Sequence, residues 1–198
     1  MTNRTKWMVI PGFCILMVAC IIPQLLAQES VYGYRVLATN KTSTMEKEMN
    51  EAADAGFIFA ATMGGETAFG GNEAVVVMIN DPSKSTEKRR VYKLLATSKT
   101  STMQKEMQQL ADEGFEYRGQ TVFKSTFGGQ EVCVIMERDM AQHSRRLQYK
   151  LLATSKTSTM QKELQEAGDA SFRLVGMTVA KTAFSGSELV SILEREIK

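Results

Sequence analysis

The residues best suited to chemistry in this chain are three Lys-Thr-Ser-Thr segments, each of which brings an amine together with three hydroxyls. We expect each segment to begin a helix, where free backbone N–H groups also point outward and anions bind readily. The sequence therefore offers a set of candidate binding residues, namely Lys41, Thr42, Ser43, Thr44, Lys99, Thr100, Ser101, Thr102, Lys156, Thr157, Ser158 and Thr159.

The same hydroxyls also have a purely structural interpretation. In a capping box a serine and a glutamate or glutamine three residues later satisfy free N–H groups of the first helical turn. The matching pairs are Ser43 with Glu46, Ser101 with Gln104, and Ser158 with Gln161. Capping does not require the whole Lys-Thr-Ser-Thr sequence three times, although recent duplication would preserve it too. Helix capping and the binding of a ligand or partner both stay open.

Groups of residues typical of enzymes are missing from the sequence. His143 is the single histidine, and Cys133 is the single cysteine after residue 27. No Ser-His or Cys-His pair and no cysteine or histidine zinc site can therefore form. Cys133 lies in an apolar run, which favours a small buried side chain, with an intermolecular disulfide as the alternative. We predict a protein that is not an enzyme and has no cofactor and no metal.

Two sets of carboxylates recur at regular spacing. Glu73, Glu131 and Glu188 stand at the start of the expected last strand of each unit. Either each of them ends a turn, or the three together form a shared acidic site at a pseudo-threefold centre. Asp54, Asp112 and Asp169 lie near expected helix C-termini, where a negative charge is mildly unfavourable. A local hydrogen bond is the one reason that the sequence suggests for this second set.

All these residues recur because the chain repeats itself. The stretch Tyr92–Glu106 is identical to Tyr149–Glu163, and a looser copy begins at Tyr34. We predict repeat unit 1 over residues 31–81, repeat unit 2 over 91–139 and repeat unit 3 over 148–197. A unit of about 50 residues buries too little surface to be stable alone, so the units should pack on one another or on partner chains.

Each unit should contain one helix and three strands. Strands are expected at 34–39, 92–97 and 149–154, and pairs of strands should follow each helix, as at 57–63 and 73–79. Phe57, Phe115 and Phe172 follow the helices and are expected in the core.

Residues with helical spacing predict a buried stripe on each helix. The stripes are Met45, Met49, Ala52 and Ala53 in the first unit, Met103, Met107, Leu110 and Ala111 in the second, and Met160, Leu164, Ala167 and Gly168 in the third. Gly56 and Gly114 suit a left-handed helix end, whereas Ser171 suits it less well.

This pattern predicts an α+β protein of three tandem β-α-β-β units, each with one helix packed on a small, mostly antiparallel sheet. The last strand of the first unit reads Val75-Val76-Val77-Met78-Ile79, which is apolar on both faces. The second face of the sheet should therefore also be covered. Another repeat or another chain would supply the cover, so we expect a protein partner or self-association through this second sheet face.

Residues 1–27 differ from the rest of the chain. A basic head is followed by 21 uncharged residues from Trp7 to Ala27, which is typical of a bacterial secretory signal peptide. Alternatives are an uncleaved membrane anchor over residues 7–27 and a lipoprotein modified at Cys20. We therefore predict a periplasmic or secreted protein that meets a membrane only through this segment, if it stays uncleaved.

The rest of the chain is close to electrically neutral. Without Arg4 and Lys6, the 24 basic residues become 22 and equal the 22 acidic ones, so the charge does not favour a nucleic-acid partner. Two basic pairs, Arg89-Arg90 and Arg145-Arg146, close the expected linkers. We expect them to be solvated, with a paired anion-binding surface as the alternative.

Short motifs in each unit are similar to those of a family of small bacterial β-α-β-β domains of unknown function. Here a strand opens with Tyr-Lys-Leu-Leu, a helix ends with Glu-Gly-Phe, and the last strand closes with Met-Glu-Arg or Leu-Glu-Arg. The family typically has Tyr-Lys-Val, Glu-Gly-Trp and Leu-Lys-Arg at these places. Phenylalanine replaces its tryptophan at 57, 115 and 172, and the second copy alone keeps Glu-Gly. The resemblance implies the β-α-β-β arrangement and no activity.

Taken together, these patterns predict an exported, non-catalytic repeat protein that is a binding or structural module of the cell envelope. The alternative is a small-anion or glycan binder that uses the Lys-Thr-Ser-Thr helix N-termini. An enzyme is a distant alternative.

Overall fold

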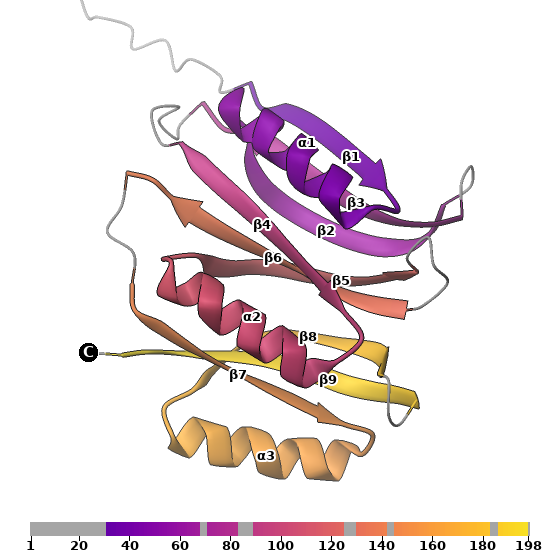
Figure 1. Ribbon diagram of the computed structural model, residues 1–198, viewed down its shortest axis with the longest axis vertical. Helices are drawn as coiled ribbons and strands as arrows, with labels where there is room; N and C mark the ends of the chain where they lie inside the picture. Colours follow the sequence, from indigo (N-terminus) through magenta and orange to yellow (C-terminus); the bar gives the residue numbers. More distant parts are fainter. Residues whose placement is uncertain are drawn as a thin grey trace, which may run out of the picture.

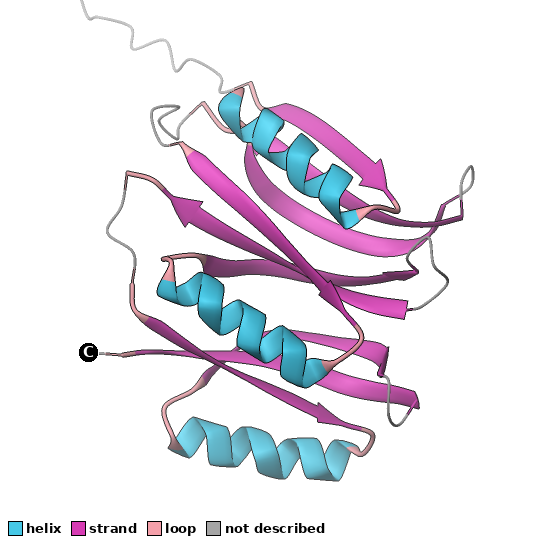
Figure 2. Cartoon of the chain, in the orientation of Figure 1, coloured by secondary structure: helices cyan, strands magenta, loops and turns pink. Residues whose placement is uncertain are grey.

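The computed structural model describes residues 31–67, 71–82, 89–124, 130–141, 145–182 and 186–197. The elements follow the order strand, helix, strand, strand three times (Figure 2). The first set is β1 (Gly33–Thr39), α1 (Thr42–Asp54), β2 (Ile58–Thr67) and β3 (Gly71–Asn80). The second is β4 (Arg90–Thr97), α2 (Thr100–Asp112), β5 (Glu116–Lys124) and β6 (Gln130–Asp139). The third is β7 (Leu147–Thr154), α3 (Thr157–Asp169), β8 (Arg173–Thr182) and β9 (Gly186–Glu196).

The strands form three antiparallel sheets of three strands each, in the orders β1-β3-β2, β4-β6-β5 and β7-β9-β8. A helix joins the first two strands of each set, which run parallel, and the third strand lies between them and pairs with both. The predicted α+β class is thus confirmed. The second strand of each set has an irregularity in its pairing at the same place, between Phe59 and Ala61 in β2, Tyr117 and Gly119 in β5, and Leu174 and Gly176 in β8.

The helices bury most of the predicted stripes. All four expected residues of α1 are buried, as are Met103, Met107 and Ala111 of α2, whereas Leu110 is half-buried. On α3 only Met160 and Ala167 are buried, and Gly168 is exposed. The prediction was therefore wrong for Gly168. The reason is that α1 and α2 each pack against a following sheet, whereas α3 packs on β7 and β8 among the described elements.

The predicted capping boxes are wrong. The residues at the N-cap positions are Lys41, Lys99 and Lys156, and no side chain caps any of the three helices. Instead, the hydroxyl of the threonine two residues earlier accepts a hydrogen bond from the lysine N–H at each turn, at 3.1, 3.1 and 3.3 Å. The serines lie one residue inside the helix start, which frees Glu46 and Gln104 for contacts with the next sheet.

The helix ends follow the predicted left-handed geometry. Gly56 and Gly114 have φ of 86° and 88°, and Ser171 takes the same position with φ of 65°. The following phenylalanine N–H donates to a carbonyl five residues back in all three places, as in Phe57 to Ala52, which is the Schellman arrangement. Ser171 has a Cβ in a conformation that disfavours one, so this helix end is the most strained, as predicted.

The sheets and helices stack along the long axis of the molecule. Figure 1 shows α1 between β1 and β4, α2 between β4 and β7, and α3 beyond β7 at the bottom. The core accordingly divides into two clusters. One joins α1 and the first sheet to Tyr92, Cys133 and Ile135 of the second sheet, and the other joins α2 and the second sheet to the third.

The three phenylalanines expected in the core are buried to different degrees. Phe115 is 4% exposed, whereas Phe57 and Phe172 are half-buried. An arginine lies over each ring, with Arg35 at 4.7 Å from the Phe57 centroid and Arg195 at 4.6 Å from that of Phe172. The expectation is thus confirmed for Phe115 and met only in part for the others.

The helices of the described residues have 13 residues each, and none is long and apolar enough to cross a membrane. The predicted signal or anchor over residues 1–27, including Cys20, lies outside the described residues. His143 lies outside them as well.

Candidate functional site

The contact between α1 and β4 is built from side chains that bind the free edge of a strand. The amide of Asn50 accepts from the Tyr92 N–H at 2.9 Å and donates to the Tyr92 carbonyl at 3.0 Å. The carboxylate of Glu46 accepts from the Leu94 N–H at 2.9 Å and from the Lys93 amine at 2.9 Å. Helix α1 thus satisfies the strand edge that β6 leaves unpaired.

The contact between α2 and β7 repeats this arrangement. Gln108 accepts from the Tyr149 N–H at 3.0 Å and donates to the Leu147 carbonyl at 3.0 Å, while Gln104 accepts from the Leu151 N–H at 2.9 Å. The amide of Gln108 also donates to Asp112 at 2.9 Å. This last bond orients the amide toward the strand and gives the recurrent aspartate at the helix end a local role. We call the side chain at this position, Asn50 or Gln108, the amide clamp.

The tyrosine of the clamped strand reaches back into the preceding sheet. The Tyr92 hydroxyl accepts from the Phe59 N–H at 2.9 Å, and the Tyr149 hydroxyl accepts from the Tyr117 N–H at 2.8 Å. Both N–H groups lie at the irregular point of the second strand of a sheet, where the backbone departs from regular pairing. Each junction between successive sheets therefore uses the same three contacts, which are an amide clamp, a second helix side chain and a tyrosine hydroxyl.

The side of the second and third sheets that holds these tyrosines is thereby covered by the preceding helix and sheet, but the matching side of the first sheet is not. Tyr34 and Val36 match Tyr92 and Leu94 in the sequence repeat, yet they are 66% and 65% exposed, whereas Tyr92 is 0% exposed. Most of the side chains on this side of β1-β3-β2 are apolar, namely Tyr34, Val36, Ala38, Ile58, Ala61, Met63, Val75, Val77 and Ile79, and Glu73 lies on the same side at the start of β3. We call this surface the open face. Large apolar surfaces of this kind mark interaction sites.

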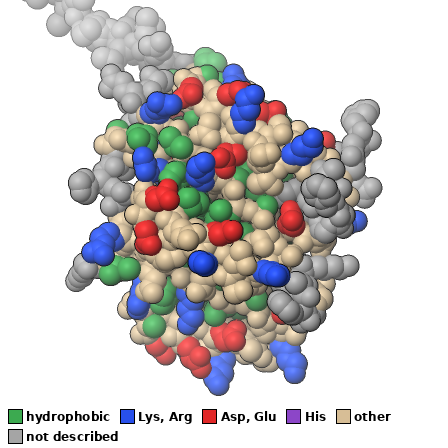
Figure 3. Space-filling model, viewed as in Figure 1, with side chains coloured by type: hydrophobic (Ala, Val, Ile, Leu, Met, Phe, Trp, Pro, Cys, Tyr) green, Lys and Arg blue, Asp and Glu red, His purple; other side chains and the backbone are tan. Residues whose placement is uncertain are grey.

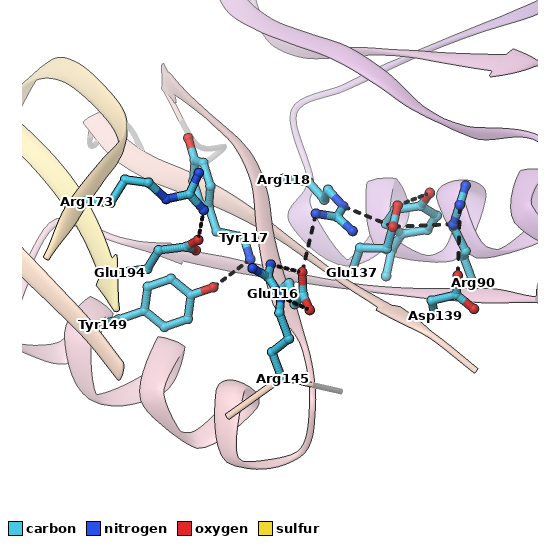
Figure 4. A network of polar contacts seen from close by, with 11 residues as sticks. Arg90, Glu116, Tyr117, Arg118, Glu137, Asp139, Arg145, Tyr149, Arg173 and Glu194 are labelled. Atoms are coloured by element: carbon cyan, nitrogen blue, oxygen red, sulfur yellow. Dashed lines mark hydrogen bonds and ion pairs between the residues drawn. The ribbon is translucent and has the colours of Figure 1, made fainter. Parts of the chain in front are cut away.

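A second candidate site is a network of arginines and carboxylates between the second and third sheets (Figure 4). Glu137 of β6 is buried and accepts from the Tyr92 hydroxyl at 2.7 Å and from Arg118 at 3.0 Å, and Arg90 lies 3.4 Å away. Glu116 is held by Arg145, and Glu194 by Arg173. The residues around Arg145 and Arg173 line a hollow of about 380 Å³.

The charges of this network balance one another. Arg90, Arg118, Arg145 and Arg173 face Glu116, Glu137, Asp139 and Glu194, four against four. The hydrogen bond from Arg145 lowers the pKa of the Glu116 carboxyl below its ordinary value. Burial, followed by the charge of Glu137, raises the pKa of the Tyr92 hydroxyl well above its usual range, so this hydroxyl stays protonated and donates to Glu137. Each guanidinium already has a carboxylate partner, most of them within one sheet, and the pair of Arg145 with Glu116 ties the segment before β7 to the second sheet. The network therefore has a structural role.

Three of the four arginines in the two basic pairs, Arg89, Arg145 and Arg146, are exposed as expected, and the expectation is wrong for Arg90. Arg90 is only 18% exposed at its side chain and binds carboxylates, and Arg145 binds Glu116. Arg89 pairs with Asp54 at 3.3 Å on the surface. Sequence reasoning also missed Arg118 and Arg173, which pair with the glutamates of the closing Met-Glu-Arg and Leu-Glu-Arg motifs. The recurrence of those glutamates was the available signal.

The Lys-Thr-Ser-Thr segments lie along one side of the molecule. Strands β1, β4 and β7 all end on the right in Figure 1, so the N-terminal ends of the three helices follow one another down that side. Their three lysines and three serines are exposed. A cavity beside Lys99 and Thr100 measures about 10 Å³, which is room for one water molecule. The structure thus aligns the three segments but does not bring them together into one site.

Other residues singled out by the sequence have less scope for chemistry. Glu73, Glu131 and Glu188 lie on three sheets that are stacked in a row. Within the described ranges, no group of three metal-binding side chains is close enough to hold an ion, so the shared acidic centre is wrong. Cys133 is 2% exposed, and burial raises the pKa of its thiol to about 12. The small buried side chain is confirmed there.

The fold and its junctions define a class: an α+β protein of stacked helix-backed sheets with one face left open. Comparison of the chain with family models, with curated proteins and with solved structures finds no match. The resemblance to the small β-α-β-β family therefore stays a prediction.

Proposed function

We propose that this chain is an exported, non-catalytic module of the bacterial cell envelope that binds a protein partner through the open face. The observation that carries the proposal is the contrast between equivalent tyrosines. Tyr34 is 66% exposed on the open face, whereas Tyr92 and Tyr149 are 0% and 3% exposed under a neighbouring helix and sheet. A surface whose two counterparts are covered by protein is suited to protein.

The composition of the open face supports the same proposal. Its side chains are apolar apart from the Tyr34 hydroxyl and Glu73 at the start of β3, and Tyr34, Val36 and Met63 are each at least 65% exposed. On the face of the molecule that Figure 3 shows, basic and acidic side chains are interspersed. Such a mixture favours a partner recognised by shape and apolar contact rather than by a field of one sign.

Three finer points belong to this proposal. The three sets of elements are tandem copies of one β-α-β-β unit, which the identical stretches Tyr92–Glu106 and Tyr149–Glu163 support. They are related to the small bacterial domain family whose motifs they share. Export rests on the uncharged segment Trp7–Ala27, with anchoring or lipidation at Cys20 as its alternatives.

A photoreactive side chain tests the proposal directly. Tyr34→p-benzoylphenylalanine, illuminated in intact cells, should yield a product heavier than the chain alone. The matched control is the same residue in place of Met140, which is 50% exposed and lies outside the open face. If neither position gives a product, or if both give the same one, the open face is not a specific binding surface.

The anion- or glycan-binding alternative rests on the alignment of the Lys-Thr-Ser-Thr segments along one side of the molecule. It predicts that binding depends on Lys41, Lys99 and Lys156 and weakens with salt. The open-face proposal predicts neither dependence.

A further inference from the structure

The two junctions inside the chain follow one rule. A helix of one set presents an amide clamp, which accepts from the tyrosine N–H of the first strand of the next set, and a second polar side chain, which accepts from the N–H two residues later. The clamp also donates to a strand carbonyl, that of Tyr92 itself at the first junction and that of Leu147 at the second. Asn50 and Glu46 do this for β4, and Gln108 and Gln104 do it for β7. Two halves of such a junction are left over, one at each end of the stack.

The first unused half is on α3. Gln165 and Gln161 match Gln108 and Gln104 in the sequence repeat. Gln165 is exposed, and its amide donates to Asp169 at 3.0 Å, just as Gln108 donates to Asp112 at 2.9 Å. The clamp is thus already oriented, with its carbonyl oxygen available for a strand N–H. Helix α3 packs on β7 of its own set, and within the described part of the chain no first strand of a following set lies against the clamp.

The second unused half is on β1. Tyr34 and Val36 match the clamped residues Tyr92 and Leu94. The registers are also equivalent, because Tyr34 pairs with Ile79 as Tyr92 pairs with Glu137. The outer edge of β1 therefore presents the N–H and carbonyl groups that α1 takes up from β4.

Apolar contacts next to the clamp match as well. At the first junction a Cβ on Gly119 would lie 2.9 Å from the Phe59 ring and 3.3 Å from Thr62, and at the second a Cβ on Gly176 would crowd Tyr117 and Gln120. The side chains that contact the glycine are Phe59 and Thr62 at the first junction and Tyr117 and Gln120 at the second. The residues of β8 at the same positions of the repeat are Leu174 and Met177, which are 46% and 58% exposed. On the open face the residue matching the two glycines is the small Ala61.

We propose that copies of the chain stack head to tail, with α3 and β8 of one copy docked on β1 and the open face of the next. This inference rests on the proposed role of the open face as a binding surface, and it names a second copy of the chain as the partner. The contact continues the geometry of the two internal junctions. Because the two surfaces are different, the assembly is heterologous and grows beyond a dimer unless its rotation closes a ring.

The contact between copies should be weaker than the internal junctions, because the first sheet lacks one hydrogen-bond acceptor. Glu137 accepts a hydrogen bond from the Tyr92 hydroxyl, and Glu194 lies beside the Tyr149 hydroxyl. In the first sheet, Ile79 occupies the position of these glutamates. The Tyr34 hydroxyl would therefore accept a hydrogen bond from β8 without donating to a carboxylate. Stacking should accordingly be reversible and depend on concentration.

Variants that block one end each give a decisive test. Val36→Glu places a charge on the open face, and Met177→Glu places one on β8. Both residues are exposed in the single chain, so folding should be unaffected, whereas burying the unpaired carboxylate should weaken docking by about 100-fold or more. Met140→Glu, at a surface residue outside both ends, is the matched control. The wild type and each variant are purified from the cells that produce them, and their mass is measured by sedimentation velocity over a range of concentrations.

We expect the average mass of the wild type and of Met140→Glu to rise steadily with concentration. Each end variant alone should be monomeric, yet an equimolar mixture of the two should form a dimer that grows no further, because one intact head meets one intact tail. A wild type that stays monomeric, or a mixture that does not dimerise, would overturn the proposal. Self-association of Met177→Glu but not of Val36→Glu would also overturn it, since the open face would then pair with itself.

The photoreactive residue at Tyr34 provides a measurement that does not depend on these variants. In a mixture of heavy-isotope and ordinary copies, it should join α3 or β8 peptides of one isotope to β1 of the other. Attachment to residues 1–30 of the same chain or to a different protein would overturn head-to-tail stacking, although the different protein would leave the proposed function standing. Absence of any product would remove both.

Discussion

Tyr34 and Tyr92 occupy the same position of the sequence repeat and lie in opposite environments. Tyr92 is enclosed by α1, bonds to Asn50 through its backbone, and links Phe59 to Glu137 through its hydroxyl. Tyr34 is two-thirds exposed on the open face. Since both residues open a strand of the same register, the difference comes from what precedes each strand in the stack. An equivalent position in a repeat is therefore structural or available for binding according to its place in the array.

The sharpest way to break this comparison is to remove the two tyrosines in turn. Tyr92→Ala should cost about 3–5 kcal/mol in the free energy of unfolding, because it empties a buried site and leaves Glu137 without its hydroxyl donor. Tyr34→Ala should cost less than about 0.5 kcal/mol in the monomer. Urea denaturation at low protein concentration measures both. Similar costs for the two variants would contradict the assignment of an open and a covered face.

The amide clamps give a second comparison, of smaller size. Gln108→Ala should cost about 1–3 kcal/mol, because the Tyr149 N–H and the Leu147 carbonyl lose their partner at a junction. Gln165→Ala, on the free side of α3, should cost less than about 0.5 kcal/mol. The same denaturation experiment applies. A large loss for Gln165→Ala in the monomer would mean that α3 supports its own sheet through this side chain.

Acid stability should differ between the two internal junctions. The lowered pKa of Glu116 favours the ionised carboxylate in the folded state, so its contribution is present above the unfolded pKa of about 4.3 and is lost as the pH falls through the folded pKa. The contribution should stay below about 1 kcal/mol, because Arg145 is partly exposed.

The first junction has Ile58 at the position of Glu116 and lacks this dependence. Glu116→Gln should therefore flatten the fall of unfolding free energy between about pH 5 and pH 2. The exposed Glu113→Gln is the control. An unchanged acid limb in Glu116→Gln would show that the pair with Arg145 does not persist in solution.

The smallest effects are expected at the Lys-Thr-Ser-Thr segments. Ser101 is not the N-cap and is exposed, so Ser101→Ala and Lys99→Ala should each change stability by less than about 0.5 kcal/mol. Partner binding should also survive a combined alanine substitution of Lys41, Lys99 and Lys156. Weaker binding in that variant, with unchanged stability, would favour the anion or glycan alternative over the open face.

Local sequence patterns were sufficient for the elements of the fold. The methionine and alanine spacing located the buried stripes of α1 and α2, and the glycines at 56 and 114 located two helix ends. The apolar run around Cys133 predicted its burial. These features depend on side chains a few residues apart, whose mutual geometry is set by the helix or strand itself.

The partners of polar side chains could not be predicted in the same way. Glu46 and Gln104 were assigned to capping boxes, but they bind strands 47 or 48 residues further along the chain. Glu116 likewise binds Arg145, 29 residues further along the chain. Local capping and long-range pairing use the same donors and acceptors, and only the packing of sheets decides which partner is within reach.

The sequence repeat separates what local sequence determines from what tertiary packing determines. Tyr92–Glu106 and Tyr149–Glu163 are identical, and their sequence alone determined that each forms a strand, a turn and the start of a helix. Within these stretches Gln104 bonds to the edge of β7, whereas its counterpart Gln161 lies on the helix face that no described strand covers. Identical segments share their backbone conformation because that depends on neighbours in the chain. Their contacts differ because the tertiary structure packs the first strand of another sheet against α2, whereas among the described residues no strand of a further sheet packs against α3.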